Sequence, residues 1–301
     1  MLFLKRFVLL AGSSFTLAGG ALGSHAEQPA TSKTDKPAPG IEKEQAKQGE
    51  LKVLADGYHS AITKSFVAVV RDASTYAALV KLDGNLPKLD EEFFKSNAVI
   101  AAFLGERNTG GYSVDLVPEG PGGFRVVEKK PGKDIMVPQM ITSPFKLVSV
   151  SAGVASQIWL ELGDAWNRQQ KYVVMKGTFI MSGGIAGRVE EFGLEGQVLV
   201  MRGGRLATFK FLLKKAGETN QHMLFEFATG IVDDNGAITI FKLGAGSLVS
   251  QPNSGLQARG RFADNDNRLL FGFTSLPSMI ADGYSGKGNI EAGILGSAPK
   301  P

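Results

Sequence analysis

The sequence predicts an α+β N-terminal domain of about one hundred residues, followed by a mostly antiparallel all-β domain, either a sandwich or a barrel. Three observations predict this fold class. Capping residues and helical spacing occur near the start of the ordered region, at residues 72–81 and 90–94. From about residue 153 onward, alternating apolar and polar stretches follow one another, separated by glycine-rich turns. The 301 residues, 43% of them hydrophobic, suffice for two cores.

The first 26 residues have the layout of a secretory signal peptide. Lys5 and Arg6 give a positive start, residues 7–22 are mostly apolar or small, and Ser24 and Ala26 suit a signal-peptidase site. The apolar stretch is shorter than a membrane-spanning helix and is interrupted by Gly and Ser. We therefore expect cleavage near Ala26 and a periplasmic or extracellular protein without stable membrane insertion.

The remaining boundaries follow from changes in composition. Residues 27–50 mix Pro, Ala, small polar residues and balanced charge, and they offer almost nothing to bury. Such a segment is expected to be a disordered linker. The α+β domain is then expected at 51–152, the β domain at 153–296 and a short tail at 297–301.

Two helices and several strands are expected in the N-terminal domain. Asp72 precedes apolar residues at helical spacing in 72–81, and Asp90 precedes a second short helix whose acidic first turn suits the helix dipole. The segment 98–104 is a continuous apolar run, which is typical of a buried strand. Further strands are expected at 112–117, 124–128, 136–141 and 145–151.

The C-terminal half is expected to contain eight or nine short strands joined by tight turns. Asn235-Gly236 predicts a hairpin with a type I′ turn, and Gly203-Gly204 predicts another hairpin. The expected strands are 157–162, 172–181, 194–202, 206–214, 223–232, 237–243, 256–262 and 269–274, with a last one near 289–294. Alternating phenylalanines could fill the core or line a cavity: Phe209, Phe211, Phe225, Phe227, Phe241, Phe271 and Phe273.

The sequence offers few groups for catalysis, metals or cofactors. The absence of Cys excludes a thiolate nucleophile, a cysteine zinc site and an iron–sulfur cluster. After signal cleavage, His59 and His222 are the remaining histidines, and they lie far apart in the sequence. Asp264-Asn265-Asp266-Asn267 lacks the spacing of a calcium loop and is expected to be a polar hairpin tip. We expect no enzyme, no cofactor and no metal.

The charge balance gives no reason to expect a nucleic-acid partner. The chain has a formal net charge of +4, and removal of the signal peptide leaves 31 Lys and Arg against 29 Asp and Glu. A surface that binds the phosphate backbone needs a clear excess of clustered positive charge. The oligomeric state is not predicted.

Three segments of the N-terminal domain resemble the PrcB C-terminal domain family. They are FLGERNTGGYSV at 103–114, PGKDIMV at 131–137 and TSPFKLV at 142–148, preceded by LPKLD at 86–90. The similarity spans about residues 60–151. The resemblance implies an extracytoplasmic, noncatalytic module that assists a secreted protease complex. A protein partner, with an exported protease as the implied class, is therefore expected.

Two turns are the candidate partner-binding site. Gly110 and Gly111 permit positive φ in a tight hairpin, and Pro144 interrupts strand pairing. The two turns are either simple turn chemistry or neighbouring surfaces that contact a partner. The candidate residues are Arg107, Thr109, Gly110, Gly111, Tyr112, Thr142, Ser143, Pro144 and Phe145.

Two alternative functions remain open at this point. Residues 108–112 and 120–124 resemble two loops of the chagasin-type protease inhibitors, although the Pro expected after Asn108 is absent. The β domain could instead enclose an apolar small molecule and act as a carrier. An outer-membrane barrel is disfavoured because aromatic girdles are not evident.

Overall fold

The computed structural model describes residues 51–294 except 121, 152–157, 184–187, 218, 220–221, 243–255 and 276–284. The described residues belong to one compact unit that starts at Ala46. The predicted signal peptide, linker and tail lie outside the described residues, as does the predicted domain boundary at 152/153. Within the described ranges, no helix is long and apolar enough to cross a membrane.

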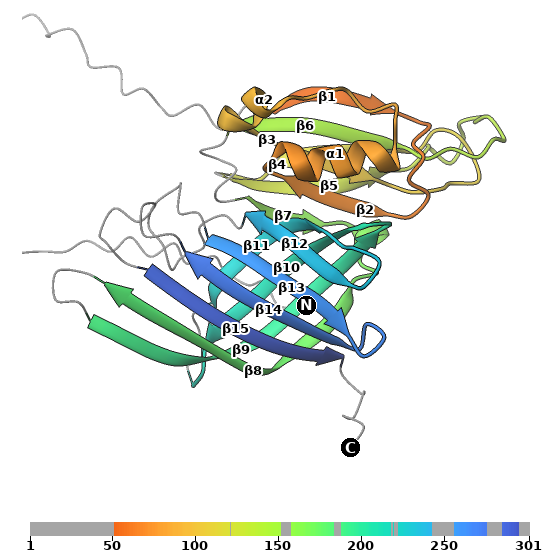
Figure 1. The fold of residues 1–301 in the computed structure, drawn as a ribbon. Coiled ribbons are helices and arrows are strands. Elements are labelled where there is room, and N and C mark those ends of the chain that lie inside the picture. Colours follow the sequence, from red (N-terminus) through yellow and green to blue (C-terminus); the bar gives the residue numbers. More distant parts are fainter. Residues whose placement is uncertain are drawn as a thin grey trace, which may run out of the picture. The chain divides into compact units, whose positions relative to one another are not determined.

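The described residues form a mostly antiparallel β structure with two α-helices (Figure 1). In chain order the elements are β1 (Lys52–Gly57), β2 (Phe66–Val70), α1 (Ala73–Leu82), α2 (Glu91–Ser96), β3 (Asn97–Phe103), β4 (Ser113–Pro118), β5 (Gly123–Lys129), β6 (Phe145–Ser151), β7 (Trp159–Leu162), the 3-10 helix η1 (Asp164–Trp166), β8 (Gln170–Gly183), β9 (Arg188–Gly203), β10 (Leu206–Lys215), β11 (His222–Ile231), β12 (Ala237–Lys242), β13 (Leu256–Ala263), β14 (Arg268–Ser275) and β15 (Ser285–Ile294).

Both predicted helices begin at the capping residues that predicted them. The Asp72 side chain accepts a hydrogen bond from the Thr75 backbone N–H, and Asp90 accepts one from the Phe93 N–H. These bonds satisfy N–H groups that lack a partner within the helix. Tyr76 of α1 is buried and joins the core that lies under the helix.

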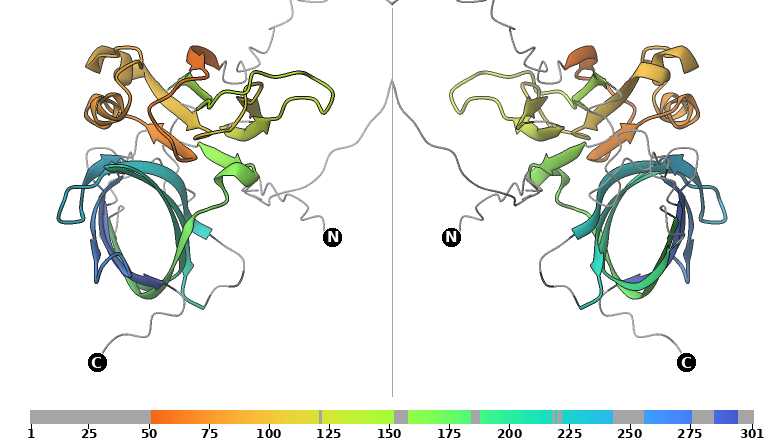
Figure 2. Two further views of the ribbon diagram at one scale, coloured as in Figure 1. Left: turned by 90° about the vertical axis from the view of Figure 1, so that its right-hand side faces the viewer. Right: turned by 90° about the vertical axis from the view of Figure 1, so that its left-hand side faces the viewer.

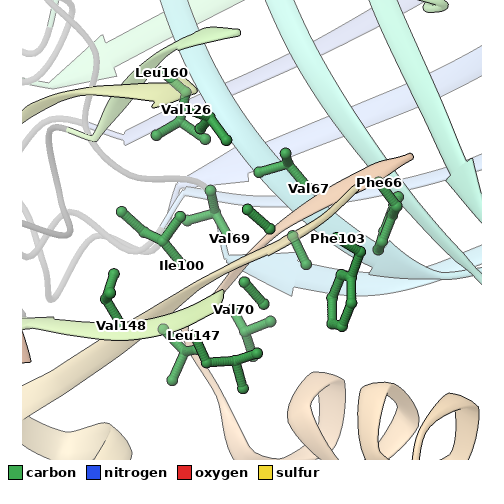
Figure 3. Packing of buried hydrophobic residues seen from close by; sticks show 14 of the residues in the cluster. Phe66, Val67, Val69, Val70, Ile100, Phe103, Val126, Leu147, Val148 and Leu160 are labelled. Carbon is green, nitrogen blue, oxygen red and sulfur yellow. The ribbon is translucent and has the colours of Figure 1, made fainter. Parts of the chain in front are cut away.

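The first seven strands form two small sheets. The first is antiparallel with the order β1-β6-β3-β2, and the second has the order β4-β5-β7. Strand β7 pairs with β5 in parallel, so the strand predicted at 157–162 does not join the antiparallel sheet of the C-terminal half. Buried side chains of β2, β3, β5, β6 and β7 contribute to a common core (Figure 3).

The remaining eight strands form a nearly closed barrel-like sheet. Its order is β11-β10-β9-β8-β15-β14-β13-β12, so that consecutive strands pair and β15 returns to β8. The two end strands are joined by the 233–236 hairpin and share one bridge, Val232 with Ile238. Figure 2 shows this sheet curving around on itself. Of the two predicted architectures, the barrel is therefore the one observed.

Aromatic rings fill the barrel interior where the structure describes them. Phe209 and Phe211 of β10 contact Phe271 of β14 edge to face, with ring centroids 5.0 and 5.2 Å apart. Strands β10 and β14 are separated by three others in the sheet order, so these rings meet across the interior. Phe227 differs from the other described rings because it faces outward and joins the core shared with the N-terminal strands. The Phe225 and Phe241 side chains lie outside the described residues.

The outer wall of the barrel packs against edge strand β2. Thr208 Oγ1 donates to the Val67 carbonyl at 2.7 Å, and the Val69 N–H donates to Thr229 Oγ1 at 2.9 Å. Met201, Leu206 and Phe227 of the barrel belong to the same buried cluster as Phe66 and Val67. The barrel thus supplies part of the N-terminal core.

Two local predictions are corrected by the structure. No strand forms at 136–141, where Pro138 lacks the N–H that a ladder needs and Met136 is fully exposed. The 233–236 turn is not type I′, because only Gly236 has positive φ (78°). The Asp233 carboxylate accepts the N–H groups of Asn235 and Ala237, which favours a right-handed turn followed by a left-handed glycine.

Candidate protein-binding site

An exposed apolar loop connects β5 to β6. It comprises residues 130–141 and extends beyond the ends of the neighbouring strands (Figures 1 and 2). We call it the apolar loop. Four large hydrophobic side chains on it are open to solvent: Ile135 is 64% exposed, Met136 99%, Met140 46% and Ile141 65%. Exposed apolar side chains gathered in this way are typical of a surface that contacts another molecule.

The apolar loop is held at its base by backbone hydrogen bonds to the preceding segment. Arg107 and Thr142 exchange two bonds, with N···O distances of 2.8 and 2.9 Å. Thr142 Oγ1 donates to the Thr109 carbonyl at 3.0 Å, and the Gly110 N–H donates to the Pro138 carbonyl at 2.8 Å. We call these contacts between residues 107–112 and residues 131–142 the clamp. They tie the base of the loop to the chain that leads into β4.

The two glycines of the clamp allow the loop to approach closely. A Cβ atom on Gly111 would lie 2.8 Å from Pro131 Cβ and Val137 Cγ1, and the residue has φ of 82°. A Cβ on Gly110 would lie 3.1 Å from Pro138 Cδ. The predicted tight hairpin at this point is wrong, because β3 and β4 belong to different sheets. Close packing, rather than a hairpin turn, is what requires glycine here.

Arg107 links the clamp to the sheet below it. Its Nε lies 3.0 Å from Glu128 Oε1 of β5, and its guanidinium carbon lies 5.8 Å from the centre of the Tyr112 ring. The Arg107 and Glu128 side chains are only 21% and 15% exposed, which reduces solvent screening of the pair. This residue therefore combines an ion pair with a cation–π contact.

The other side of the loop base is tied to the segment after β1. The Ser143 N–H donates to the Tyr58 carbonyl at 2.7 Å, and the Ser60 N–H donates to the Ser143 carbonyl at 3.0 Å. The Tyr58 side chain is 53% exposed and so adds a further aromatic group beside the loop. Phe145 turns inward and stacks on Phe103 with ring centroids 6.1 Å apart.

The structure brings the two turns together but buries much of their surface. Gly110, Thr142, Ser143 and Pro144 are buried, Arg107, Thr109, Tyr112 and Phe145 are half-buried, and Gly111 is exposed. Their role as partner contacts stays a prediction. The exposed large apolar side chains nearby belong to the apolar loop instead. The sequence pattern predicts a strand at 136–141 and so misses its exposure, although Pro138 within the segment and Pro131 before it indicate a loop.

The described histidine and the acidic residues that could take part in catalysis or metal binding do not form a site. His59 is exposed and forms a backbone bridge with Ser143. In the predicted polar tip at 264–267, Asp264 pairs with Arg268 and Asp266 with Arg202. Across the part of the chain that the structure describes, no group of three or more His, Asp or Glu side chains could hold a metal ion. The side chain of His222 lies outside the described residues.

Comparison with known proteins identifies one family. A family model described as PrcB C-terminal matches residues 98–151. The matched segment runs from β3 to β6 and contains both the clamp and the apolar loop. No curated protein and no solved structure matches the chain. The family resemblance given by the sequence motifs is thus confirmed for residues 98–151, which make up less than a fifth of the chain.

Proposed function

We propose that this chain is an exported, noncatalytic binding protein that serves as an accessory subunit of an extracytoplasmic protease complex. Its contact with the partner is made by the apolar loop, with Tyr58 at the edge of the contact. The observation that carries the proposal is the exposure of four large hydrophobic side chains on a loop with a fixed base. The PrcB C-terminal match over the same residues supports a role in a protease complex.

The fixed base of the loop favours binding. A loop that is already held before association loses less conformational freedom when the partner docks. Six backbone or hydroxyl hydrogen bonds at residues 107–110 and 142–143 restrict the base, while the side chains of Ile135, Met136 and Ile141 stay available for contact. Methionine also adapts its shape to a partner surface more easily than branched side chains do.

Neither alternative function is favoured by the geometry. An apolar carrier needs free space inside the barrel, and the contacts of Phe209, Phe211 and Phe271 fill the interior at their level. A chagasin-like inhibitor needs its loops side by side. Residues 108–112 and 120–124 lie at opposite ends of β4, so they cannot form one wedge. In this proposal the barrel acts as a scaffold for the N-terminal strands.

The proposal is tested by crosslinked capture from the extracytoplasmic fraction of the source cells, followed by mass spectrometry. The wild-type chain is expected to capture a protease or a subunit of a protease complex. The double variant Met136→Glu, Ile141→Glu should lose this partner at least tenfold, because two charges would have to be buried in the contact. The purified chain alone should show no peptidase activity.

A matched control separates the loop from general surface hydrophobicity. Met175 and Val189 on β8 and β9 are also exposed apolar residues, at 53% and 70%. The double variant Met175→Glu, Val189→Glu should capture the partner as well as the wild type does. Equal capture by the loop variant, or a captured partner unrelated to any protease, would contradict the proposal.

A further inference from the structure

A depression lies on the wall of the barrel formed by β8, β15, β14 and β13. Its volume is about 630 Å³, within the range of small-molecule sites. These four strands are neighbours in the sheet (Figure 1). The lining residues are Lys176, Thr178, Arg259, Gly260, Arg261, Leu270, Phe271, Gly272, Asn289, Ile290 and Glu291.

The strand register places the polar lining residues on one face of the sheet. Lys176, Glu291, Leu270 and Arg261 are consecutive cross-strand partners, and so are Thr178, Asn289, Gly272 and Arg259. Directly paired residues in a sheet point to the same side. Phe271 and Ile290 alternate with them and are buried in the barrel interior. The two polar rows therefore face outward.

Gly272 leaves the floor of the depression open. A Cβ atom at this position would meet only Asn289 Oδ1, at 3.3 Å. The side chains around it stand higher, with Arg259 on one side and Thr178 and Asn289 on the other. Lys176 and Arg261 are three strand spacings apart, about 14 Å between backbones. A ligand of the size of one sugar fits between them.

The depression carries uncompensated positive charge. Among the described residues, Lys176, Arg259 and Arg261 make no ion pair, and all three are exposed. The single carboxylate in the lining, Glu291, is already paired with Arg268. Arg259 and Arg261 are two positions apart on β13, so their guanidinium groups reach the same region and can bind an oxyanion together.

We propose that this depression binds an anionic carbohydrate, a sugar that carries a phosphate or carboxylate group. Arg259 and Arg261 hold the oxyanion, while Lys176, Thr178, Asn289 and Glu291 on the other side of the depression bond the hydroxyl groups. The one aromatic residue in the lining, Phe271, is 3% exposed, so an uncharged sugar has no ring to stack on. This site is separate from the apolar loop, and its test does not depend on whether the proposed protein partner binds.

Calorimetric titration of the full chain with glucose 6-phosphate, glucuronate and glucose tests the proposal. At least one anionic sugar is expected to bind saturably at one site, and glucose at least tenfold more weakly. The tighter of the two anionic probes identifies the preferred anionic group. Two variants should each weaken binding at least tenfold: Arg259→Gln with Arg261→Gln, which removes the charge, and Gly272→Leu, which keeps the charge and fills the floor.

The matched control changes the same net charge elsewhere on the same wall. Lys171 of β8 and Lys287 of β15 are exposed and outside the lining, so Lys171→Gln with Lys287→Gln should leave the affinity within twofold. Thermal unfolding of every variant checks that it is folded. The proposal is overturned if neither anionic sugar binds saturably, if the control loses as much affinity as the arginine variant, or if folded Gly272→Leu binds normally.

Discussion

Asp115 on β4 pairs with two lysines, one on the neighbouring strand of its own sheet and one on the other small sheet. Its carboxylate lies 2.9 Å from Lys146 Nζ of β6 and 2.6 Å from Lys129 Nζ of β5. Burial alone raises the pKa of the Asp115 carboxyl, but the hydrogen bonds and positive charges of Lys129 and Lys146 outweigh it. The pKa therefore lies below its ordinary value of 3.8. The folded state thus prefers the charged carboxylate more strongly than the unfolded chain does.

This preference makes stability depend on pH in a specific direction. A lowered folded-state pKa stabilises fully above the unfolded value of 3.8 and is lost as pH falls through the folded pKa. Asp115→Asn should therefore lower the free energy of unfolding by about 1 kcal/mol at pH 7, and the difference should shrink as pH falls from 3.8 through the lower folded-state pKa. Urea unfolding of both proteins across this range measures it. A constant difference at all pH values would contradict the assignment.

At the scale of elements, edge strand β2 depends on two threonines of the barrel. Thr208 and Thr229 satisfy Val67 O and Val69 N–H, and their hydroxyl oxygens lie 2.8 Å apart. Both side chains are buried. Replacing either with the isosteric valine leaves a buried backbone group without a partner, which costs about 1–3 kcal/mol.

The double variant Thr208→Val, Thr229→Val should cost less than the sum of the two single changes, because the hydroxyls bond each other. Denaturant midpoints with unchanged slopes measure these effects. Thr274→Val, on an exposed position of β14, is the control and should change stability by less than about 0.5 kcal/mol. Additive effects at 208 and 229 would show that the two hydroxyls act separately.

Most strands of the barrel could be predicted from the sequence because they have one buried and one more exposed face. Period-two alternation then appears directly, as in β13 and β14, and consecutive strands pair as hairpins. Alternation reports burial but not the pairing partner. For this reason β7 was predicted in the correct place but assigned to the wrong sheet. The segment Phe66–Val70 is buried on both faces and was not predicted at all.

The candidate site was predicted only in part. The two motifs left open whether residues near Thr109 and Thr142 are neighbours, and in the structure a hydrogen bond joins these two residues. The apolar loop between them was not predicted, because its spaced hydrophobic residues resemble a half-buried strand. Whether such a segment is buried depends on neighbouring elements far away in the sequence. The sequence pattern alone does not contain that information.

At the scale of the whole described unit, the N-terminal strands do not complete their own core. Trp166 of η1 is 1% exposed and donates from Nε1 to the Phe103 carbonyl at 2.9 Å. A Cβ on Gly123 of β5 would lie 2.6 Å from the Trp159 ring, so β7 packs directly on β5. Both tryptophans follow the predicted domain boundary at 152/153. Residues after that boundary, including Trp166, therefore contribute to the same hydrophobic core as the strands before it.

Two fragments test this dependence. A fragment of residues 51–152 lacks β7 and Trp166, so buried apolar surface around Phe103 and Val126 would be exposed and cooperative unfolding should be absent. A fragment of residues 51–168 restores both and should unfold cooperatively, though at a lower temperature than the full chain. The reason is that Met201, Leu206 and Phe227 of the barrel are still missing from the core. Calorimetry and near-ultraviolet circular dichroism measure the unfolding temperature and cooperativity of the two fragments and the full chain. If the two fragments unfold with the same cooperativity and at the same temperature, β7 and Trp166 are dispensable for this core.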